Sequence, residues 1–372
     1  MLQELMPNEC FRATNLFLDL DYSLSIRALI EGNSPGRIFV DEPLAPKTAF
    51  ALTVEGYFLA GDYENSKTNQ ELRHFLKEKI FTGKVYVNSD TYMSLGIYPS
   101  AWEDRLPELI PSHEVEKFGC YHYLCDQVTL DWRGIVRDGY ELFHVNRSFF
   151  NNPDITFPED VRSWSDIEGQ WGSLDNFFEK GVSYCVVHEG EVVSWCVPDC
   201  VAEDQIEVGI ITHPAHRRRG LASVAVAVTV EHCLNHGFSK VGWHCVSDNV
   251  GSWKTAERVG FERSREYDAY YYIYDEVDHL AELGWHYFKR GEYKKTVMYY
   301  DRVFGSRDEN PDYYYHLAAA AWAALGDSDK ALRYLHAAVD HGWRRPENTK
   351  DVEEFEILHG TSGWDAVLER MK

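Results

Sequence analysis

The chain has 372 residues, a length typical of two or three domains rather than of one small domain. Hydrophobic residues make up 44% of the chain and charged residues 26%, which are ordinary values for a protein with a buried core. The net charge of −23 disfavours binding to nucleic acid or to an anionic membrane surface, and favours neutral or cationic partners. Residues from Asp275 onward contribute −6, so residues 1–274 carry −17.

The apolar stretches are too short to cross a membrane. The longest, Leu221–Val230 and Leu317–Leu325, are about half of the ~20 residues that a spanning helix needs. The first ten residues contain acids and no basic segment, so a secretory signal is not expected. Eight cysteines scattered over a long chain indicate reduced thiols. We therefore expect a cytoplasmic protein.

Residues 1–135 have the pattern of a small α+β lobe. Turn signals such as Asn33-Ser34-Pro35-Gly36 separate short strand-like runs, and a polar helix is expected near Asn69–Ile80. The strand-like runs are Arg37–Asp41, Thr48–Val54, Tyr57–Ala60, Lys84–Val87 and Phe118–Cys125.

Residues 136–274 predict a sheet that contains a βαβ unit. The strand candidates are Val182–His188, Val192–Val197, Gln205–Thr212 and Lys240–Val246, and the helix candidates are Gly220–His236 and Gly251–Val259. The first of these helices is apolar nearly all round, as expected of a crossover helix buried against a sheet. Strand, helix and strand within about 40 residues form a right-handed crossover by default.

Residues 275–372 are expected to be helical and to contain an internal repeat. The positions Leu283-Gly284, Tyr287, Gly291 and Tyr300 line up with Ala318-Ala319, Trp322, Gly326 and Leu335 at an offset of 35 residues. This pattern resembles the tetratricopeptide repeat over Val277–Trp343. Two units are fewer than the three or more that a stable solenoid needs. We therefore expect the tail to pack on the preceding domain or on a second chain, as in a homodimer.

The segment with the clearest chemistry joins a buried strand to the apolar helix. Pro214 ends the strand, and Arg217, Arg218 and Arg219 precede a helix that begins with Gly220, Leu221 and Ala222. Unpaired N–H groups and the positive dipole end at a helix start form an anion site. Glycine allows the backbone to approach a ligand closely. We interpret the segment as a diphosphate site.

At this point the sequence resembles the GCN5-related N-acetyltransferases. Their acetyl-CoA loop reads Arg/Gln-x-x-Gly-x-Gly/Ala, and Arg217, Gly220 and Ala222 match it. A second element of the family follows the next strand, with Asn249, Ser252, Ala256 and the pair Gly260-Phe261.

The first lobe adds to this resemblance. Asn33–Asp41 and Phe58–Asp62 are similar to acetyltransferases of the zwittermicin A resistance type, and the likeness covers roughly residues 30–274. The resemblance implies an α/β (α+β) fold, namely a GNAT-type mixed sheet with a βαβ acetyl-CoA site. We expect an N-terminal lobe at 1–135, an acetyltransferase domain at 136–274 and an all-α domain at 275–372.

The implied reaction is direct attack of a primary amine on the thioester of acetyl-CoA, with no metal. The amine belongs to a small molecule or to a protein. Carried over by position, the residues that contact acetyl-CoA are Ile211, Thr212, Arg217, Arg218, Arg219, Gly220, Leu221, Ala222, Asn249 and Ser252. The N–H groups of Arg218 to Ala222 would hold the pyrophosphate, and main-chain groups of Ile211 and Thr212 would pair with the pantetheine arm and the acetyl oxygen.

The catalytic base implied by the resemblance is Glu207, ten residues before Arg217. An ion-paired or solvated strand residue is the alternative reading of Glu207. His244 is a second candidate proton acceptor, although such a residue is more often a core histidine. Many family members carry a general-acid tyrosine where this chain has Ala256, so the acid is Ser252, a tyrosine of Tyr267–Tyr274, or none, because a thiol pKa near ~8.5 permits unassisted departure.

Other constellations carry less weight. The pairs His232 and His236, Cys196 and Cys200, and His213 and His216 have metal-ligand spacing but no recognised third and fourth ligands.

The absence of the usual tyrosine at Ala256 also allows a different class of function. In that alternative, a catalytically degenerate core acts as a scaffold, and the repeat-like tail binds a protein or peptide partner.

Overall fold

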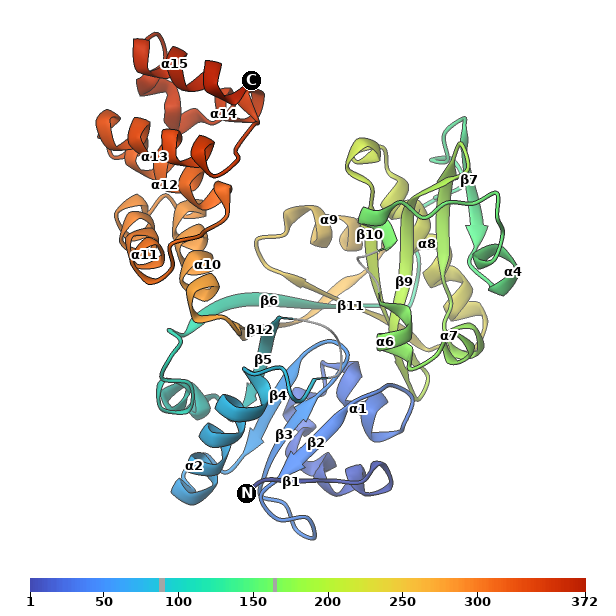
Figure 1. The fold of residues 1–372 in the computed structure, drawn as a ribbon. Coiled ribbons are helices and arrows are strands. Elements are labelled where there is room, and N and C mark those ends of the chain that lie inside the picture. Colours follow the sequence, from blue (N-terminus) through green and yellow to red (C-terminus); the bar gives the residue numbers. More distant parts are fainter. Residues whose placement is uncertain (87–90, 163–165) are drawn as a thin grey trace. The chain divides into compact units, whose positions relative to one another are not determined.

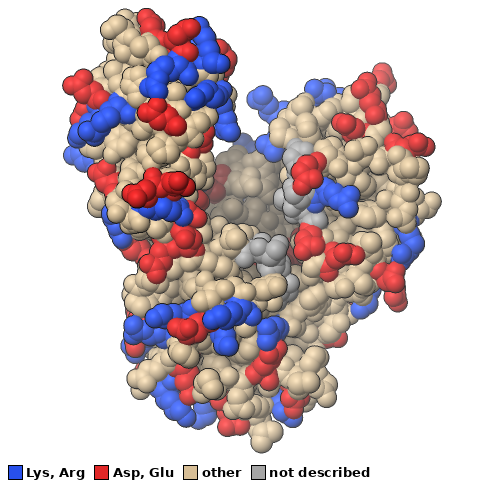
Figure 2. Space-filling view, in the orientation of Figure 1, with Lys and Arg blue, Asp and Glu red and all other residues tan. Residues whose placement is uncertain are grey.

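The computed structural model describes residues 1–86, 91–162 and 166–372. It divides into two compact units, Met1–Tyr271 and Tyr272–Lys372 (Figure 1). None of the described helices is both long and apolar enough to cross a membrane. On the face shown in Figure 2, acidic and basic side chains are interspersed, so this face carries both signs of charge.

The first unit is built on one mixed sheet, in which twelve strands are described. Their order across the sheet is β1-β2-β3-β4-β5-β12-β6-β11-β10-β9-β8-β7. The strands are β1 Gln3–Glu4, β2 Arg37–Val40, β3 Thr48–Leu52, β4 Tyr57–Gly61, β5 Tyr92–Tyr98, β6 Glu116–Cys125, β7 Tyr140–His144, β8 Tyr184–His188, β9 Glu191–Ala202, β10 Gln205–Thr212, β11 Lys240–Val246 and β12 Glu262–Ile273. The mixed sheet predicted from the sequence is confirmed.

The first 135 residues and those that follow share this sheet. Strand β6, from the first region, pairs antiparallel with both β11 and β12 from the second. The helix α1 (Leu24–Ile30) of the first region also packs against β9. Residues 84–86 of the expected strand Lys84–Val87 form no strand, and Val87 lies outside the described residues.

The longest of the other described helices of the first unit is α8 (Leu221–Asn235), with 15 residues. The rest are η1 Pro7–Leu16, η2 Leu18–Leu20, α2 Ser66–Phe75, η3 Leu76–Ile80, η4 Ser100–Arg105, α3 Leu106–Leu109, α4 Arg147–Phe150, α5 Glu159–Arg162, α6 Ile167–Trp171, α7 Leu174–Lys180, η5 Pro214–His216 and α9 Val250–Val259.

The βαβ unit consists of β10, α8 and β11, with β10 and β11 parallel. Helix α8 packs against β8, β9, β10 and β11, and its residues from Ser223 to Val230 are all buried. Its C-terminal end is followed by Gly237, whose φ of +105° is the left-handed conformation expected of a glycine that ends a helix. Because α8 is packed on the sheet, the loop that joins the end of β10 to the N-terminus of α8 is held in place.

The second unit is helical, as predicted. Its helices are α10 Glu276–Lys289, α11 Tyr293–Ser306, α12 Asp312–Ala324, α13 Ser328–Asp340, α14 Pro346–Lys350, η6 Glu353–Leu358 and α15 Ser362–Met371. Helices α10 and α11 form one packed pair and α12 and α13 another. The turns of the two pairs contain Gly291 and Gly326, which both have positive φ and lie 35 residues apart.

Candidate active site

Strands β10 and β11 separate partway along their length. They pair in parallel from Gln205 to Glu207, and β10 then continues to Thr212 paired only with β9. On the other side, β11 stays paired with β6 from Val241 to Val246. The main chain of β10 beyond Glu207 is therefore open towards β11 in the described structure, so an extended ligand arm can lie there as a further strand would.

The loop from β10 to α8 turns its backbone N–H groups outward. Arg218 has a φ of +60° and Gly220 one of +83°, both in the left-handed region. Within the described part of the chain, no acceptor receives a hydrogen bond from the N–H groups of Arg218 to Ser223. Six free N–H groups at the start of a 15-residue helix are the arrangement that binds a diphosphate.

The three arginines of this loop differ in what they contact. Arg217 donates from Nε to the carbonyl of Thr212 at 3.1 Å, which ties the loop back to its own strand. Arg219 donates to the hydroxyl of Tyr140 and, at 3.2 Å, to the carbonyl of Ala215. Arg218 is exposed. Arg217 and Arg219 thus shape the loop, and the guanidinium of Arg218 has no hydrogen-bond or ion-pair partner among the described residues.

The main-chain carbonyls expected to meet the pantetheine arm already accept hydrogen bonds within the first unit. The hydroxyl of Ser194 donates to the carbonyl of Ile211 at 3.3 Å, and the carbonyl of Thr212 accepts from Arg217. Ile211 also pairs with Trp195 of β9, so its main chain faces that strand, whereas the carbonyl of Thr212 keeps a lone pair for a second donor. The side chain of Leu221 is buried, so this residue can offer only its N–H.

Asn249 and Ser252 lie at the start of α9. The side-chain oxygen of Asn249 accepts from the N–H of Ser252 at 3.2 Å and caps the helix, which leaves the amide NH₂ of this exposed residue for a ligand. The hydroxyl of Ser252 accepts from Nε1 of Trp243 at 3.0 Å.

Arg258, at the other end of α9, was not singled out in the sequence. A Cβ placed on Gly220 would lie 3.9 Å from its Nη1, so this guanidinium stands beside the loop. No motif signals it, because its position depends on how α9 packs.

Ala256 occupies a fully buried position in the core of the first unit. A tyrosine there would have to displace neighbouring side chains, which explains why the usual acid is absent. Among the alternatives, the hydroxyl of Tyr267 lies 2.9 Å from Nδ1 of His244, and burial raises its pKa well above the usual range. Tyr267 is therefore a protonated group at the edge of the site.

Glu207 stands where the two strands separate. Its side chain is 2% exposed, and its Oε1 has no hydrogen-bond partner in the described structure. Burial raises its pKa well above the usual range, and the charges of Glu55 and Asp199 raise it further. Asp199 is the extra residue of a bulge in β9, opposite the step from Glu207 to Val208. A carboxyl group with a raised pKa and a free oxygen can take up a proton near neutral pH.

Two stacked histidines accompany Glu207. The rings of His122 and His244 lie 4.5 Å apart, and Nε2 of His244 is 3.7 Å from Oε1 of Glu207. Burial lowers the pKa of His122 to about 4 and that of His244 to about 3, so both are neutral at pH 7. The contact of His244 with Glu207 is consequently not an ion pair.

Both ring nitrogens of His244 are occupied. Nε2 donates to the carbonyl of Tyr22 at 3.1 Å, and Nδ1 accepts from the hydroxyl of Tyr267. Because Nε2 must carry the hydrogen and Nδ1 already has a donor, His244 has no free position for a substrate proton. His244 is therefore a core histidine whose hydrogen bonds are all made, which is the alternative to a catalytic role that its sequence position also allowed.

His122, by contrast, has a ring nitrogen, Nε2, without a hydrogen-bond partner among the described residues. Its Nδ1 lies 2.7 Å from the hydroxyl of Ser264, which also donates to the carbonyl of His122 at 3.3 Å. A hydroxyl has one hydrogen, so both bonds form only when Nδ1 carries a hydrogen, and Nε2 is then an unprotonated acceptor. Sequence reasoning missed His122, because it lies on β6, far from every motif.

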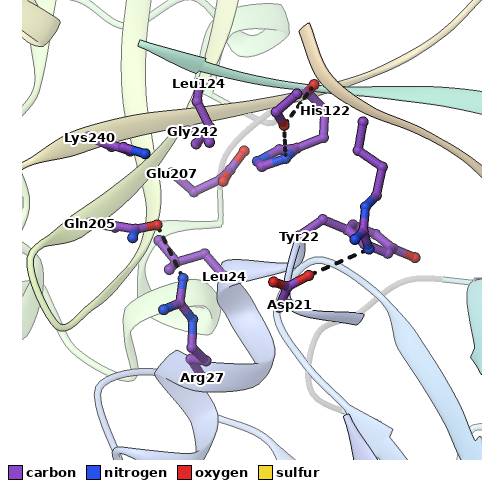
Figure 3. Close-up of a pocket in the computed structure, with 12 residues that line it drawn as sticks. Asp21, Tyr22, Leu24, Arg27, His122, Leu124, Gln205, Glu207, Lys240 and Gly242 are labelled. Carbon is purple, nitrogen blue, oxygen red and sulfur yellow. Dashed lines mark hydrogen bonds and ion pairs between the residues drawn. The ribbon is translucent and has the colours of Figure 1, made fainter. Parts of the chain in front are cut away.

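His122, Glu207 and Ser264 line a pocket of about 330 Å³ in the first unit. Its lining comes from the start of α1, from β6 and β12, and from the first residues of β10 and β11. Figure 3 shows the carboxylate of Glu207 pointing towards the ring of His122. The lining residues are Asp21, Tyr22, Leu24, Arg27, His122, Leu124, Gln205, Glu207, Lys240, Gly242, Ser264 and Arg265.

The pairs with metal-ligand spacing collect no third ligand among the described residues. The group in which three ligand atoms do come within 4.8 Å of one another is His122, Glu207 and His244. In that group, His244 presents a donor nitrogen that is already hydrogen-bonded, and the two rings are stacked rather than converging. The geometry suits proton handling better than coordination.

Comparison with known proteins identifies related chains. A family model described as GNAT acetyltransferase matches residues 14–270. The uncharacterised N-acetyltransferase YdfB of Bacillus subtilis is 24% identical over 277 residues, which are 73% of this chain and 98% of that protein. A second B. subtilis protein, the uncharacterised N-acetyltransferase YjdG, is 35% identical over 72 residues, or 18% of this chain and 43% of its own length.

A solved structure has a similar fold. A GCN5-related N-acetyltransferase-like protein from Streptococcus suis matches with a TM-score of 0.54 and 24% identity, covering 72% of this chain and 99% of that one. The family match ends at residue 270, before the helical second unit begins.

Proposed function

The chain belongs to the GNAT acetyltransferase family, and on that premise we propose that it transfers an acetyl group from acetyl-CoA to a primary amine by direct attack. The observation that carries the proposal is the opening between β10 and β11, which leads to six free N–H groups at the start of α8. These features fit the extended arm and the diphosphate of CoA. A metal has no assigned part in this reaction.

The proposed cofactor contacts are those expected from the sequence, apart from the main chain of Ile211, which faces β9. The N–H groups from Arg218 to Ala222 hold the diphosphate, and the guanidinium of Arg218 adds charge. Main-chain groups of Thr212 meet the arm, and Asn249 offers its amide NH₂. Arg258 adds a further cation beside Gly220.

The acceptor amine is proposed to enter the pocket that Glu207 lines. Acetyl-CoA supplies the thioester carbonyl that the amine nitrogen attacks. An amine arrives as an ammonium ion and must lose a proton before it can attack. Glu207 takes this proton directly or through a water molecule, and Nε2 of His122 accepts a hydrogen bond that orients the nitrogen. As the carbon–sulfur bond breaks, the thiolate of CoA leaves and is protonated by solvent, because the hydroxyl of Tyr267 is already donated to His244.

Two measurements test the proposal. Calorimetry should show CoA binding to the purified chain, and a thiol-release assay should show turnover with primary amines that depends on acetyl-CoA. CoA binding without turnover for any small amine or peptide would instead support the competing function, a scaffold that retains only the fold.

The helical second unit is proposed to be a module for a partner or for dimerisation. Its two helix pairs, with turn glycines 35 residues apart, fit the tetratricopeptide-like reading. A chain truncated after Tyr274 should keep small-amine activity if the tail serves a partner. Loss of activity towards a peptide alone would make the tail an acceptor-binding element.

A further inference from the structure

The charges around the acceptor pocket differ from those of the whole chain. The lining contains three cationic side chains, Arg27, Lys240 and Arg265, and two acidic ones, Asp21 and Glu207. Because burial raises the pKa of Glu207, its carboxyl group is neutral over a wider pH range than an exposed one. The lining is therefore net positive in a chain whose net charge is −23.

Two of the three cations are held by neighbouring groups. Arg265 lies 3.4 Å from a carboxylate oxygen of Asp21 and donates to the carbonyl of Asp19 at 2.9 Å. Arg27 lies 3.4 Å from a carboxylate oxygen of Glu203 and donates to the side-chain oxygen of Gln205 at 3.1 Å. These contacts hold both guanidinium groups at the pocket wall, although Nε of Arg27 is buried without a hydrogen-bond partner in the described structure.

Lys240 is different, because it is an exposed residue at the pocket rim whose ammonium group has no hydrogen-bond or ion-pair partner among residues 1–86, 91–162 and 166–372. It is the first residue of β11 and pairs with Gln205. Figure 3 shows Lys240 and Gln205 at one end of the pocket and His122 at the other, with Glu207 between them. The pocket thus has a proton-accepting end at Glu207 and His122 and a free cation at the opposite end.

We infer that the acceptor is a primary amine that also carries an anionic group, a carboxylate or a phosphate. This inference rests on the proposed function and names its substrate class. The amine lies against Glu207 and His122, and the anionic group lies against Lys240 at the other end. Two independent features carry the inference: the buried, unpartnered Oε1 of Glu207 and the unpaired ammonium of Lys240 in the same pocket.

The register of the strands places the backbone positions that carry the two groups close together. Lys240 lies two residues before Gly242, over which Glu207 packs, and two strand residues span about 6.5 Å. The amine and the anion should therefore be separated by a short aliphatic linker. The acceptor still arrives as an ammonium ion, as expected from the charge of residues 1–274, and the pocket adds the requirement of an anionic group opposite Lys240.

A matched set of amines tests the inference. The probes are 4-aminobutyrate, butylamine and 1,4-diaminobutane, which share a chain length but end in an anion, a methyl group or a cation, and 3-aminopropyl phosphate, which distinguishes phosphate from carboxylate. We expect kcat/KM for at least one anionic probe to exceed that for butylamine by about 10-fold or more, the effect of one well-placed ion pair. The diamine should be the poorest acceptor.

Variants at Lys240 show whether that side chain provides the preference. Lys240→Met should lower the ratio of kcat/KM for 4-aminobutyrate to that for butylamine by about 10-fold, and Lys240→Arg should restore most of it. Lys77→Met, at an exposed lysine outside the pocket, is the control and should keep the ratio. A ratio that Lys240→Met leaves unchanged, or butylamine and the diamine turning over as well as the anionic probes, would overturn the inference.

A binding experiment separates this inference from the proposed function. Calorimetric titration of the CoA-loaded protein with 4-aminobutyrate and with butylamine measures the preference without turnover. Tighter binding of 4-aminobutyrate that Lys240→Met abolishes supports the anion site even if no amine is acetylated, in which case only the proposed function fails. Equal binding of the two probes overturns the anion site even if both are acetylated.

Discussion

The carboxylate of Glu207 packs directly over Gly242, the residue it pairs with on the neighbouring strand. A Cβ placed on Gly242 would lie 3.0 Å from Cδ of Glu207 and closer still to Oε2. Gly242 does not have a positive φ, so its backbone can accept alanine. The glycine is therefore required by the position of the Glu207 side chain rather than by the strand.

Gly242→Ala should move the Glu207 carboxylate and leave the strand intact. We expect turnover to fall by about 10-fold or more, because misplacing a proton acceptor by even 1 Å has effects of this size or larger. CoA affinity, measured by calorimetry, should not change. Gly134→Ala, at a glycine with open space around it, is the matched control. Unaltered turnover in Gly242→Ala would show that the position of Glu207 does not matter for the reaction.

Glu207→Gln tests the base itself. The amide cannot accept the proton, so turnover should fall by ~10²–10⁴-fold while CoA affinity stays the same.

The raised pKa of Glu207 also has a consequence for the stability of the fold. A carboxyl group whose folded pKa is raised favours folding at low pH, and this advantage is lost as pH rises through the folded pKa. Thermal denaturation should therefore show that Glu207→Gln gains stability relative to the parent at pH 8 but not at pH 4.

His122→Phe separates orientation of the amine from removal of its proton. Phenylalanine keeps the ring in the stack but removes both nitrogens, so the bond between Nδ1 and Ser264 is lost together with the hydrogen bond from the amine to Nε2, which is worth about 1–3 kcal/mol. We expect KM for the amine to rise about 5- to 100-fold, while the acidic limb of the pH–rate profile remains. If that limb disappears in His122→Phe and persists in Glu207→Gln, His122 is the proton acceptor and our assignment is wrong.

The elements of the βαβ unit could be predicted from the sequence because local signals define them. The expected strands Gln205–Thr212 and Lys240–Val246 agree with the structure at both ends, and α8 differs from its predicted bounds by one residue at each end. Strand periodicity, Pro214 and the glycines around α8 all act within a few residues of the boundaries they determine.

The acceptor pocket could not be predicted in the same way, since it depends on pairing between distant strands. His122 reaches Glu207 only because β6 from the first region pairs with β11. Lys240 faces the same pocket as Arg27 only because α1 packs against β9. Each of these residues looks like an ordinary surface or strand residue in its local sequence.

Gly220→Val tests the diphosphate site. The φ of +83° at Gly220 disfavours a β-branched residue, and the added Cβ would lie 3.0 Å from the Ile135 side chain. We expect the loop to shift and CoA affinity to fall by about 2 kcal/mol or more, as for the loss of a buried donor. Gly237→Val, at the opposite end of α8, has similar backbone strain without the loop and controls for stability. If a folded Gly220→Val protein binds CoA as tightly as the parent, this loop is not the diphosphate site.

Glu55→Gln tests the electrostatic cause of the raised pKa of Glu207. Glu55, in the turn between β3 and β4, has its own pKa raised to about 7 by burial, and its negative charge disfavours ionisation of Glu207. Removing that charge should lower the pKa of Glu207. Since the base must be ionised to act, the acidic limb of the kcat/KM profile should move to lower pH.

The control for this experiment is Glu64→Gln, which removes an exposed carboxylate of the same lobe that does not raise the pKa of Glu207. Its profile should superimpose on that of the parent. A profile of Glu55→Gln that also superimposes would mean that the acidic limb reports a group other than Glu207. A shift to higher pH would contradict the direction of the charge effect, because removing a neighbouring negative charge stabilises the ionised carboxylate.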